Sequence, residues 1–198
     1  NVSYQVDGMR VRRECFASYP DQVMVFRLSA DKPELDVHFN IMRRPCDLGT
    51  EVVQSDIQHM PGQCGPDGVR FSCLLGAQSD GEMTQLGDFI GVKNASEIVI
   101  YIAANSDFYE EKPFDVSLNQ LKAAMALGYD EVKRRHLEDY CSLYQRAEID
   151  FGTENKEPID CRLEKLRAGQ EDAGLLELIF HYGRYLMISA SRPGSQAM

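Results

Sequence analysis

The acidic balance of this 198-residue chain, with a formal net charge of -10 and a pI near 4.9, argues against binding to nucleic acid or to an anionic membrane surface. Either partner would require clustered Lys and Arg side chains. The hydrophobic fraction of 43%, without an apolar run long enough for a membrane span, indicates a globular chain that can form one good-sized domain or two small ones.

The first half of the chain has the pattern of antiparallel strands joined by turns. The predicted strands are residues 2–6, 9–16, 22–30, 35–42, 69–77, 82–86, 89–92 and 98–103. Asp7 and Gly8 tolerate the positive φ angles of a tight turn between the first two strands. Alternation within the second strand predicts that one of its faces is solvated. Residues 43–50 and 59–68 are rich in Pro, Gly and Asp and are predicted to be surface loops.

Helical signals follow the strands. Asp115 is predicted to cap a helix that runs to about Leu127 and stops at Gly128. Asp130 begins a second helix, and Asp160 caps a brief third one. Closely spaced strands favour an antiparallel meander in a β-sandwich, and strands followed by helices indicate the α+β class.

The last predicted helix lies between its N-cap, Asp172, and the sequence Arg192-Pro193-Gly194 that ends it. Apolar side chains cover most of its circumference, so we expect it to be buried by several partner helices. The exception is a polar stripe of Glu177, His181 and Arg184 at i, i+4 and i+7. Glu177 and His181 could place two ligands on one metal, but two ligands do not make a site. The stripe therefore favours a buried polar network, and no metal site is predicted.

Other candidate residues have simpler structural interpretations. His136 lies on an apolar helix face, which favours a hydrogen-bonded core histidine over a catalytic base, while Glu138 and Asp139 fit a solvated face. A Ser/His/Asp nucleophile has no support, because no GxSxG sequence occurs. We therefore predict no catalytic residue from these patterns.

Two further motifs are weak. Gly62, Gly65 and Gly68 are spaced loosely like a phosphate-binding loop, but no GKS or GKT follows, so they are interpreted as loop glycines. Asn94 begins an Asn-Ala-Ser glycosylation sequon, a pattern that often arises by chance.

The cysteines indicate neither a zinc site nor a redox dithiol. The six are Cys15, Cys46, Cys64, Cys73, Cys141 and Cys161, without any CxxC pair. Scattered free thiols are the favoured interpretation, and a Cys46 to Cys64 disulfide stays open if the protein is exported.

Several phrases of the sequence resemble the α-L-fucosidases of glycoside hydrolase family 95. In the helical half they are GYDEVKRRHLEDYCSLYQRAEIDFG (128–152), IDCRLEKLRAG (159–169) and LLELIFHYGRYLMISASRPGS (175–195). In the β half, YQVDGMRVRRECFASYPDQVMVFRLSADKP (4–33) and GVRFSCLLGAQSDGEM (68–83) are similar to parts of that family's N-terminal β domain.

The resemblance implies an internal fragment of such an enzyme. Residues 1–108 would belong to the N-terminal β-sandwich, 109–158 to a helical linker, and 159–198 to the start of the (α/α)6 catalytic barrel. Family members remove terminal α-L-fucose from glycans with inversion, using a Glu as general acid and Asn and Asp residues that position the water. Those motifs follow the Arg-Pro-Gly turn, so no catalytic residue can be carried over, and the fragment is expected to be inactive alone.

The resemblance also bears on partners. It implies a fucosylated oligosaccharide as the parent enzyme's substrate, no cofactor, and a secreted or periplasmic location for the parent, although linkage preference and substrate-binding residues stay unknown. Truncated surfaces would favour a homo-oligomer or association with the rest of the parent chain. The alternative is a non-catalytic carbohydrate-binding or interaction module, in which Tyr19, Phe89, Tyr101 and Tyr109 would replace the missing Trp as a sugar platform.

Overall fold

The computed structural model describes residues 1–152 and 156–192 and divides the chain into two compact units, Asn1–His136 and Leu137–Met198. The strands are β1 (Val2–Val6), β2 (Met9–Ser18), β3 (Val23–Ala30), β4 (Leu35–Phe39), β5 (Glu51–Gln54), β6 (Ile57–Gln63), β7 (Arg70–Ser79), β8 (Glu82–Leu86), β9 (Phe89–Ala95) and β10 (Glu97–Ser106). The helices are α1 (Pro113–Leu127), α2 (Tyr129–Tyr144), α3 (Ile159–Arg167) and α4 (Ala173–Ala190). Antiparallel strands followed by helices confirm the predicted α+β class.

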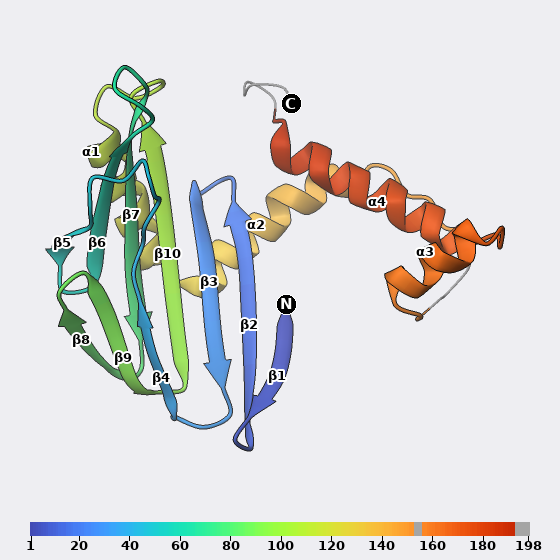
Figure 1. Ribbon diagram of the computed structural model, residues 1–198, viewed down its shortest axis with the longest axis horizontal. Coiled ribbons are helices and arrows are strands. Elements are labelled where there is room, and N and C mark those ends of the chain that lie inside the picture. Colours follow the sequence, from blue (N-terminus) through green and yellow to red (C-terminus); the bar gives the residue numbers. More distant parts are fainter. Residues whose placement is uncertain (153–155, 193–198) are drawn as a thin grey trace. The chain divides into compact units, whose positions relative to one another are not determined.

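The first unit contains two antiparallel sheets (Figure 1). The larger sheet has the order β1-β2-β3-β10-β7-β6-β5, and the smaller has the order β4-β9-β8. The prediction of a simple meander is therefore wrong, because β10 returns between β3 and β7 instead of lying at the end of a sequential series. That return places the last strand in the centre of the larger sheet.

The two sheets face each other across two apolar clusters, which gives the predicted sandwich. One cluster brings Val11 of β2 and Ile98 of β10 against Val92 of β9. The other packs Met60 and Leu75 against Ile90. Each cluster combines strands of both sheets, so apolar burial holds the layers together.

Helix α1 covers the opposite face of the larger sheet (Figure 1). Leu121 and Met125 of α1 pack with Val99 and Tyr101 of β10. Val99 and Tyr101 alternate with Ile98 and residues 100 and 102, which face the smaller sheet. Both faces of β10 are thus covered, which explains its continuous apolar sequence.

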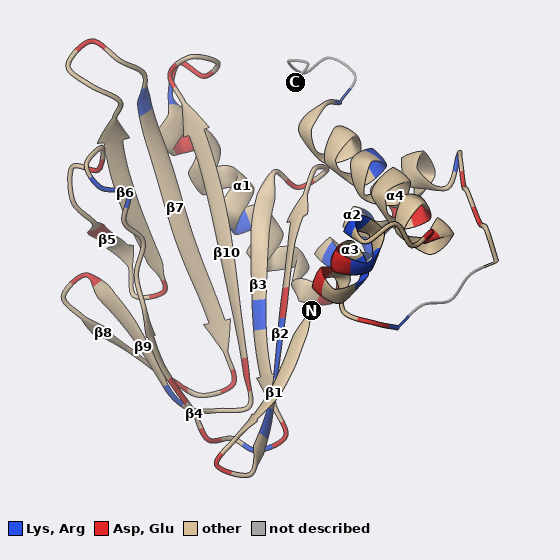
Figure 2. Ribbon diagram, turned by 45° about the vertical axis from the view of Figure 1, so that its right-hand side comes forward, with Lys and Arg blue, Asp and Glu red and all other residues tan. Residues whose placement is uncertain are grey.

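Polar turns connect the strands, and acidic residues of the first unit gather on them (Figure 2). At the β1–β2 turn, Asp7 and Gly8 have φ angles of 49° and 75°, so the predicted hairpin turn is confirmed. Asp80 follows β7 and holds the β9–β10 turn through hydrogen bonds from Ser96 and Glu97. Asp side chains suit turns because they can accept hydrogen bonds from nearby backbone amides.

The prediction of a loop over residues 59–68 is wrong for its first part. Residues 57–63 form β6, which pairs with β7 from Ile57 to Gln63 and is largely buried. Pro61 has no amide hydrogen to donate to a neighbouring strand. It is tolerated because β5 pairs with β6 only as far as His59 and does not reach Pro61. Gly62 is also a strand residue and not a loop glycine: a Cβ there would lie 2.6 Å from the carbonyl oxygen of Cys46.

Of the predicted helix caps, Gly128 and Asp172 are confirmed, while Asp115 and Asp160 are wrong. Helix α1 begins at Pro113 with Asp115 inside its first turn, and α3 begins at Ile159, so neither Asp115 nor Asp160 is the N-cap. Proline supplies the start in both cases, because its fixed φ angle suits a first turn. Gly128 ends α1 with φ of 79°, as predicted. Asp172 caps α4, accepting a hydrogen bond from the backbone amide of the third residue after it.

Helix α4 is more exposed than its sequence predicts. Only Leu175 is buried, while Leu176, Ile179, Tyr182 and Met187 are more than half exposed. The second unit has too few described neighbours to cover a helix that is apolar on most sides. The helix ends at Ala190, and the predicted stop residues Pro193 and Gly194 lie outside the described part. None of the described helices has both the length and the hydropathy that crossing a membrane requires.

Candidate functional site

The polar stripe of α4 holds the extended segment that precedes α3. His181 has the Tyr144 hydroxyl 2.9 Å from its Nδ1 and the carbonyl oxygen of Ile149 2.9 Å from its Nε2. Glu177 accepts a hydrogen bond of 3.1 Å from the backbone nitrogen of Phe151. Both residues therefore have structural partners.

The third member of the stripe has the same role. Arg184 donates to the carbonyl oxygens of Ala147 and, at 3.2 Å, Leu143. Across residues 1–152 and 156–192, no three His, Cys, Asp or Glu side chains come close enough to hold a metal ion. The stripe is thus a set of hydrogen bonds that fixes chain direction after α2.

An ion pair links α3 to the start of α4. Arg162 donates two hydrogen bonds of 2.8 Å to Asp172, which also accepts one of 2.9 Å from the Leu175 amide. The pKa of Asp172 falls to about 2, chiefly because Arg162 favours the carboxylate. This carboxylate is already saturated with donors, which suits a structural link and not proton transfer.

The second half of α2 contains two residues, His136 and Asp139, for which the sequence suggested a role. Asp139 was expected on a solvated face but pairs with Arg192, with Oδ2 2.6 Å from the guanidinium. His136 is half-buried and stacks on Phe16, with ring centroids 4.9 Å apart. Both residues therefore have structural contacts.

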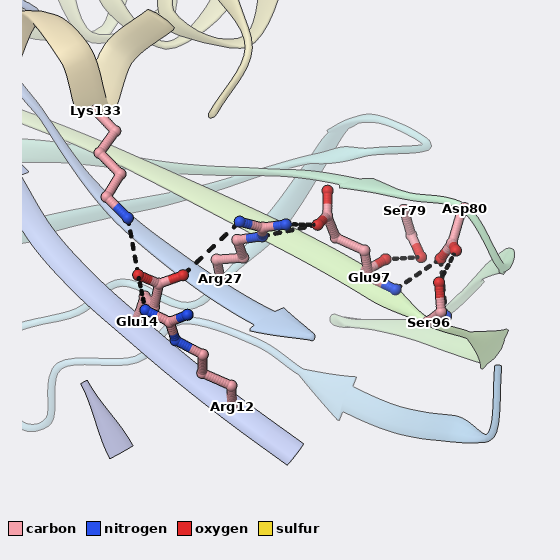
Figure 3. A network of polar contacts seen from close by, with 8 residues as sticks. All are labelled: Arg12, Glu14, Arg27, Ser79, Asp80, Ser96, Glu97 and Lys133. Atoms are coloured by element: carbon pink, nitrogen blue, oxygen red, sulfur yellow. Dashed lines mark hydrogen bonds and ion pairs between the residues drawn. The ribbon is translucent and has the colours of Figure 1, made fainter. Parts of the chain in front are cut away.

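A denser polar network lies in the first unit, around Glu14 of β2 (Figure 3). This side chain is only 6% exposed and has three cationic neighbours: Lys133 at 2.8 Å, Arg12 at 3.1 Å and Arg27 at 3.7 Å. The hydrogen bond from Lys133 is the main reason why the pKa of Glu14 is lowered. Glu14 therefore joins the start of α2 to the sheet as a buried carboxylate.

Arg27 extends this network to β10 (Figure 3). Its Nε lies 2.7 Å from Oε2 of Glu97, and its guanidinium lies over the Tyr129 ring, 4.5 Å from the centroid. Asp80 accepts hydrogen bonds from the Ser96 hydroxyl and from two backbone amides. Its pKa is lowered, chiefly by the Ser96 hydroxyl. These carboxylates are held in fixed positions.

A cavity of about 330 Å³ lies beside this network. Its walls are residues 78–80 at the end of β7, alternate residues of β10 from Glu97 to Tyr101, and the first two residues of α2. The Tyr101 side chain is fully buried, and burial raises its pKa to about 12, helped by the charge of Glu97. Its hydroxyl has no hydrogen-bond partner within the described structure.

A chain of three side chains crosses β5, β6 and β7 in the order of a Ser-His-acid triad. The Ser72 hydroxyl lies 2.9 Å from Nε2 of His59, whose Nδ1 lies 2.6 Å from Glu51. Ser72 is only 3% exposed and lies under α1, where Phe114 packs edge-on against His59. A substrate cannot reach this serine. The arrangement therefore satisfies the hydrogen bonds of buried polar groups.

The candidate sugar platform is not assembled. Tyr19, Phe89 and Tyr109 are exposed, but Tyr101 is in the core, so its assignment to a surface platform is wrong. Tyr109 packs against Phe108 with an angle of 82° between the rings, which is not a flat stacking surface.

The remaining motifs are structural. All six cysteines are free thiols, so Cys46 and Cys64 do not form the disulfide left open by the sequence. Gly65 has a φ of 82° in the turn between β6 and β7, which fits a loop glycine. Asn94 is exposed near the end of β9.

Comparison with known proteins identifies the family of the chain, which the side-chain networks described above do not. Residues 1–111 match the family model described as "Glycosyl hydrolase family 65, N-terminal domain". The chain belongs to this glycosyl hydrolase family. Residues 128–198 of the glycosyl hydrolase chain match the family 95 catalytic domain, which confirms the resemblance of the helical half to family 95.

Curated relatives of this glycosyl hydrolase chain agree. It is 29% identical over 241 residues to "Alpha-L-fucosidase 2" of Arabidopsis thaliana, covering 98% of this chain and 28% of that protein. It is 24% identical over 207 residues to "Probable alpha-fucosidase A" of Aspergillus niger, covering 93% of this chain and 26% of that protein. The chain thus spans little more than a quarter of the length of these relatives.

A solved structure shares the fold. A chain provisionally assigned as a kojibiose phosphorylase from the human microbiome superposes with a TM-score of 0.50 at 9% identity, over 72% of this chain and 23% of that one. At an identity this low, the superposition supports a shared fold and nothing more. The shared architecture is that of antiparallel sheets followed by helices.

Proposed function

We propose that this chain is the part of an α-L-fucosidase that joins its N-terminal β domain to its catalytic domain. The observation that carries the proposal is the order of the two family matches along one chain, together with α-fucosidase relatives aligned over at least 93% of it. The substrate would be a glycan with a terminal α-L-fucosyl group, hydrolysed with inversion of the anomeric carbon.

The described residues fit a supporting role in that reaction. An inverting hydrolase needs a general acid and a second group that activates water, at a separation of about 6.5–9.5 Å across an open site. Here Glu177 accepts a hydrogen bond from a backbone amide, Asp172 is bound by Arg162, and Glu14 is buried among cations. None of these three carboxylates is placed as such an acid or base. We infer that residues 1–108 serve as part of the β domain, 109–158 as a helical linker and 159–198 as the start of the (α/α)6 barrel.

The exposed apolar side chains of α4 support a further part of the proposal. We infer that Leu176, Ile179, Tyr182 and Met187 pack against other helices of the catalytic domain, because a helix with this surface gains free energy when it is covered. The 198-residue chain alone should then associate through this surface. Light scattering after size exclusion tests this: a monomer at every concentration would contradict it, and Ile179→Lys should reduce the association.

The activity is tested by release of fucose from 2′-fucosyllactose. The whole polypeptide that contains this segment should release fucose, first as the β anomer in proton NMR, while the 198 residues alone should release none. Fucose release by the 198 residues would show that they contain a complete active site. No release by the whole polypeptide from any α-fucosylated glycan would favour the alternative, a non-catalytic carbohydrate-binding or interaction module.

A further inference from the structure

The turn between β9 and β10 contains the sequon Asn94-Ala95-Ser96, which takes no part in the function proposed above. We propose that Asn94 accepts an N-linked oligosaccharide when the chain is exported through a secretory route that has the oligosaccharide transferase. The donor is a preassembled oligosaccharide carried on a lipid diphosphate. The proposal depends only on residues of the first unit and not on fucosidase activity.

The sequon supplies each group that the transfer needs. These are a side-chain amide at the first position, any residue except proline at the second, and a hydroxyl at the third. A bond forms between the side-chain nitrogen of Asn94 and the anomeric carbon of the first sugar, and the bond from that carbon to the lipid diphosphate breaks. The amide nitrogen gives one proton to a base of the transferase, and the lipid diphosphate leaves as an anion.

The first structural observation is that the side chain of Asn94 is exposed and unused. Its backbone nitrogen donates to Asp36 at 3.1 Å, but its side-chain amide has no hydrogen-bond partner among the described residues. Asn105 is the contrasting case, because its side chain donates at 2.8 Å to both Ser117 and Gln120. A sugar linked to Asn94 therefore displaces no contact of the fold.

The second observation is the backbone conformation that brings Asn94 to the surface. Its φ of 53° is in the left-handed region, and the register of β4 against β9 shifts at the same level, between Leu35 and Val37. The normal alternation of a strand is interrupted there, so that Lys93 and Asn94 are exposed one after the other. An exposed turn is the structural context in which a sequon is an acceptor.

The hydroxyl of the sequon is engaged once the chain has folded. Asp80 accepts hydrogen bonds from the Ser96 hydroxyl and, at 3.0 Å, from the Ser96 backbone nitrogen (Figure 3). The transferase needs the same hydroxyl, so the transfer must precede closure of the β9–β10 turn on the emerging chain. The exposed Asn94 side chain then allows the modified chain to fold.

The position of the oligosaccharide has a consequence for the smaller sheet. The order β4-β9-β8 makes β4 an edge strand, and Asp36 of β4 binds the backbone of Asn94. An oligosaccharide on Asn94 lies beside this open edge. A bulky, solvated group there hinders pairing of β4 with strands of other chains.

Secretion of the 198-residue chain from a fungal expression host tests the proposal. Asn1-Val2-Ser3 is a second sequon, so the assay uses Asn1→Gln, which leaves Asn94 as the single acceptor sequon. After endoglycosidase treatment, peptide mass mapping should find one N-acetylglucosamine on Asn94. A secreted chain without a sugar on Asn94 would overturn the proposal.

Two matched variants locate the sugar. Asn94→Asp removes the acceptor nitrogen but suits the same left-handed backbone, so it should lose the oligosaccharide completely and keep its thermal midpoint. Ser96→Thr keeps the hydroxyl and should keep the oligosaccharide. An oligosaccharide that persists in Asn94→Asp, or that is lost in Ser96→Thr, would contradict the assignment.

The folded chain should tolerate the modification. Chains with the intact and the trimmed oligosaccharide should have the same thermal midpoint, because the Asn94 side chain contributes no hydrogen bond within the described structure. A lower midpoint with the intact oligosaccharide would show that the site is not open. Fucose release by the whole polypeptide should be unchanged in Asn94→Asp, so failure of this inference is distinguishable from failure of the proposed function.

Discussion

Replacing Glu14 by Gln removes the only carboxylate that contacts Lys133 and Arg12 among the described ion pairs. Loss of one partner from a fully buried ion pair costs about 3–5 kcal/mol, and a hydrogen bond to a charged group contributes about 1.5–3 kcal/mol. Lys133 and Arg27 are 35% and 28% exposed, so both can turn toward water, and Arg27 keeps Glu97. The lower values therefore apply, and we expect the free energy of unfolding to fall by about 2 kcal/mol.

Urea unfolding followed through amide signals of the first unit would measure this change. The matched control is Glu131→Gln on the same helix, because Glu131 pairs with Arg134 in solvent and its loss should leave the transition almost unchanged. Combining Glu14→Gln with Lys133→Met should cost less than the sum of the single changes, since the two side chains interact directly. An unfolding midpoint for Glu14→Gln equal to that of the unaltered chain would refute the reasoning.

Four further outcomes follow from packing and titration. Leu121→Ala removes a fully buried side chain and should lower the free energy of unfolding by about 3 kcal/mol in urea. Gly62→Ala should cost about 2 kcal/mol in the same assay, because its Cβ would meet a phenyl ring and a backbone carbonyl at less than van der Waals distance. Asp172 has a folded pKa of about 2 against an ordinary value of 3.8, so its pairing with Arg162 stabilises the fold above pH 3.8 and is lost as pH falls toward 2; an NMR titration that gave an ordinary pKa would contradict the pairing. Tyr101 has a folded pKa of about 12 against 10.0, so burial of its neutral hydroxyl contributes fully to the stability of the fold below pH 10, and this contribution is lost as pH rises through 12. Tyrosinate absorbance during a pH titration would show the raised pKa.

The strand pattern was predictable where one local signal decided the structure. Asp7 and Gly8 fix the first hairpin through backbone conformation alone. Residues 57–63 were missed because Pro61 and Gly62 are loop formers in most contexts. They lie in a strand here because of long-range pairing with β7. No local pattern contains that information.

The buried network was missed for a related reason. Alternation in β2 predicted a solvated face, but Glu14 and Phe16 on one face lie against α2, through Lys133 and His136. Only the helix that returns across the sheet makes this face an interior one, and the helix is more than a hundred residues away in sequence. The one signal that could have suggested it is that Glu14, which directly follows Arg12 and Arg13, is the single acidic residue of a strand with three arginines.

The polar stripe of α4 shows the opposite case. The spacing of Glu177, His181 and Arg184 correctly predicted a set of neighbouring polar groups. Their partners are mainly backbone atoms of residues 143–151, together with one phenol, which no side-chain pattern could identify. Spacing along a helix thus gives the direction of a side chain but not the segment that it meets.

The central position of β10 also affects how the chain behaves before it is folded. Residues 98–103 combine high strand propensity with no charge and no proline, which is the composition of segments that assemble into cross-β aggregates. In the native sheet β3 and β7 occupy both edges of this strand, and α1 and the smaller sheet cover its faces. Both of these neighbours are distant from β10 in sequence, so the strand stays exposed in the unfolded chain until these long-range pairings form. Refolding yield should therefore fall as protein concentration rises, and the native topology itself acts as the protection against self-assembly.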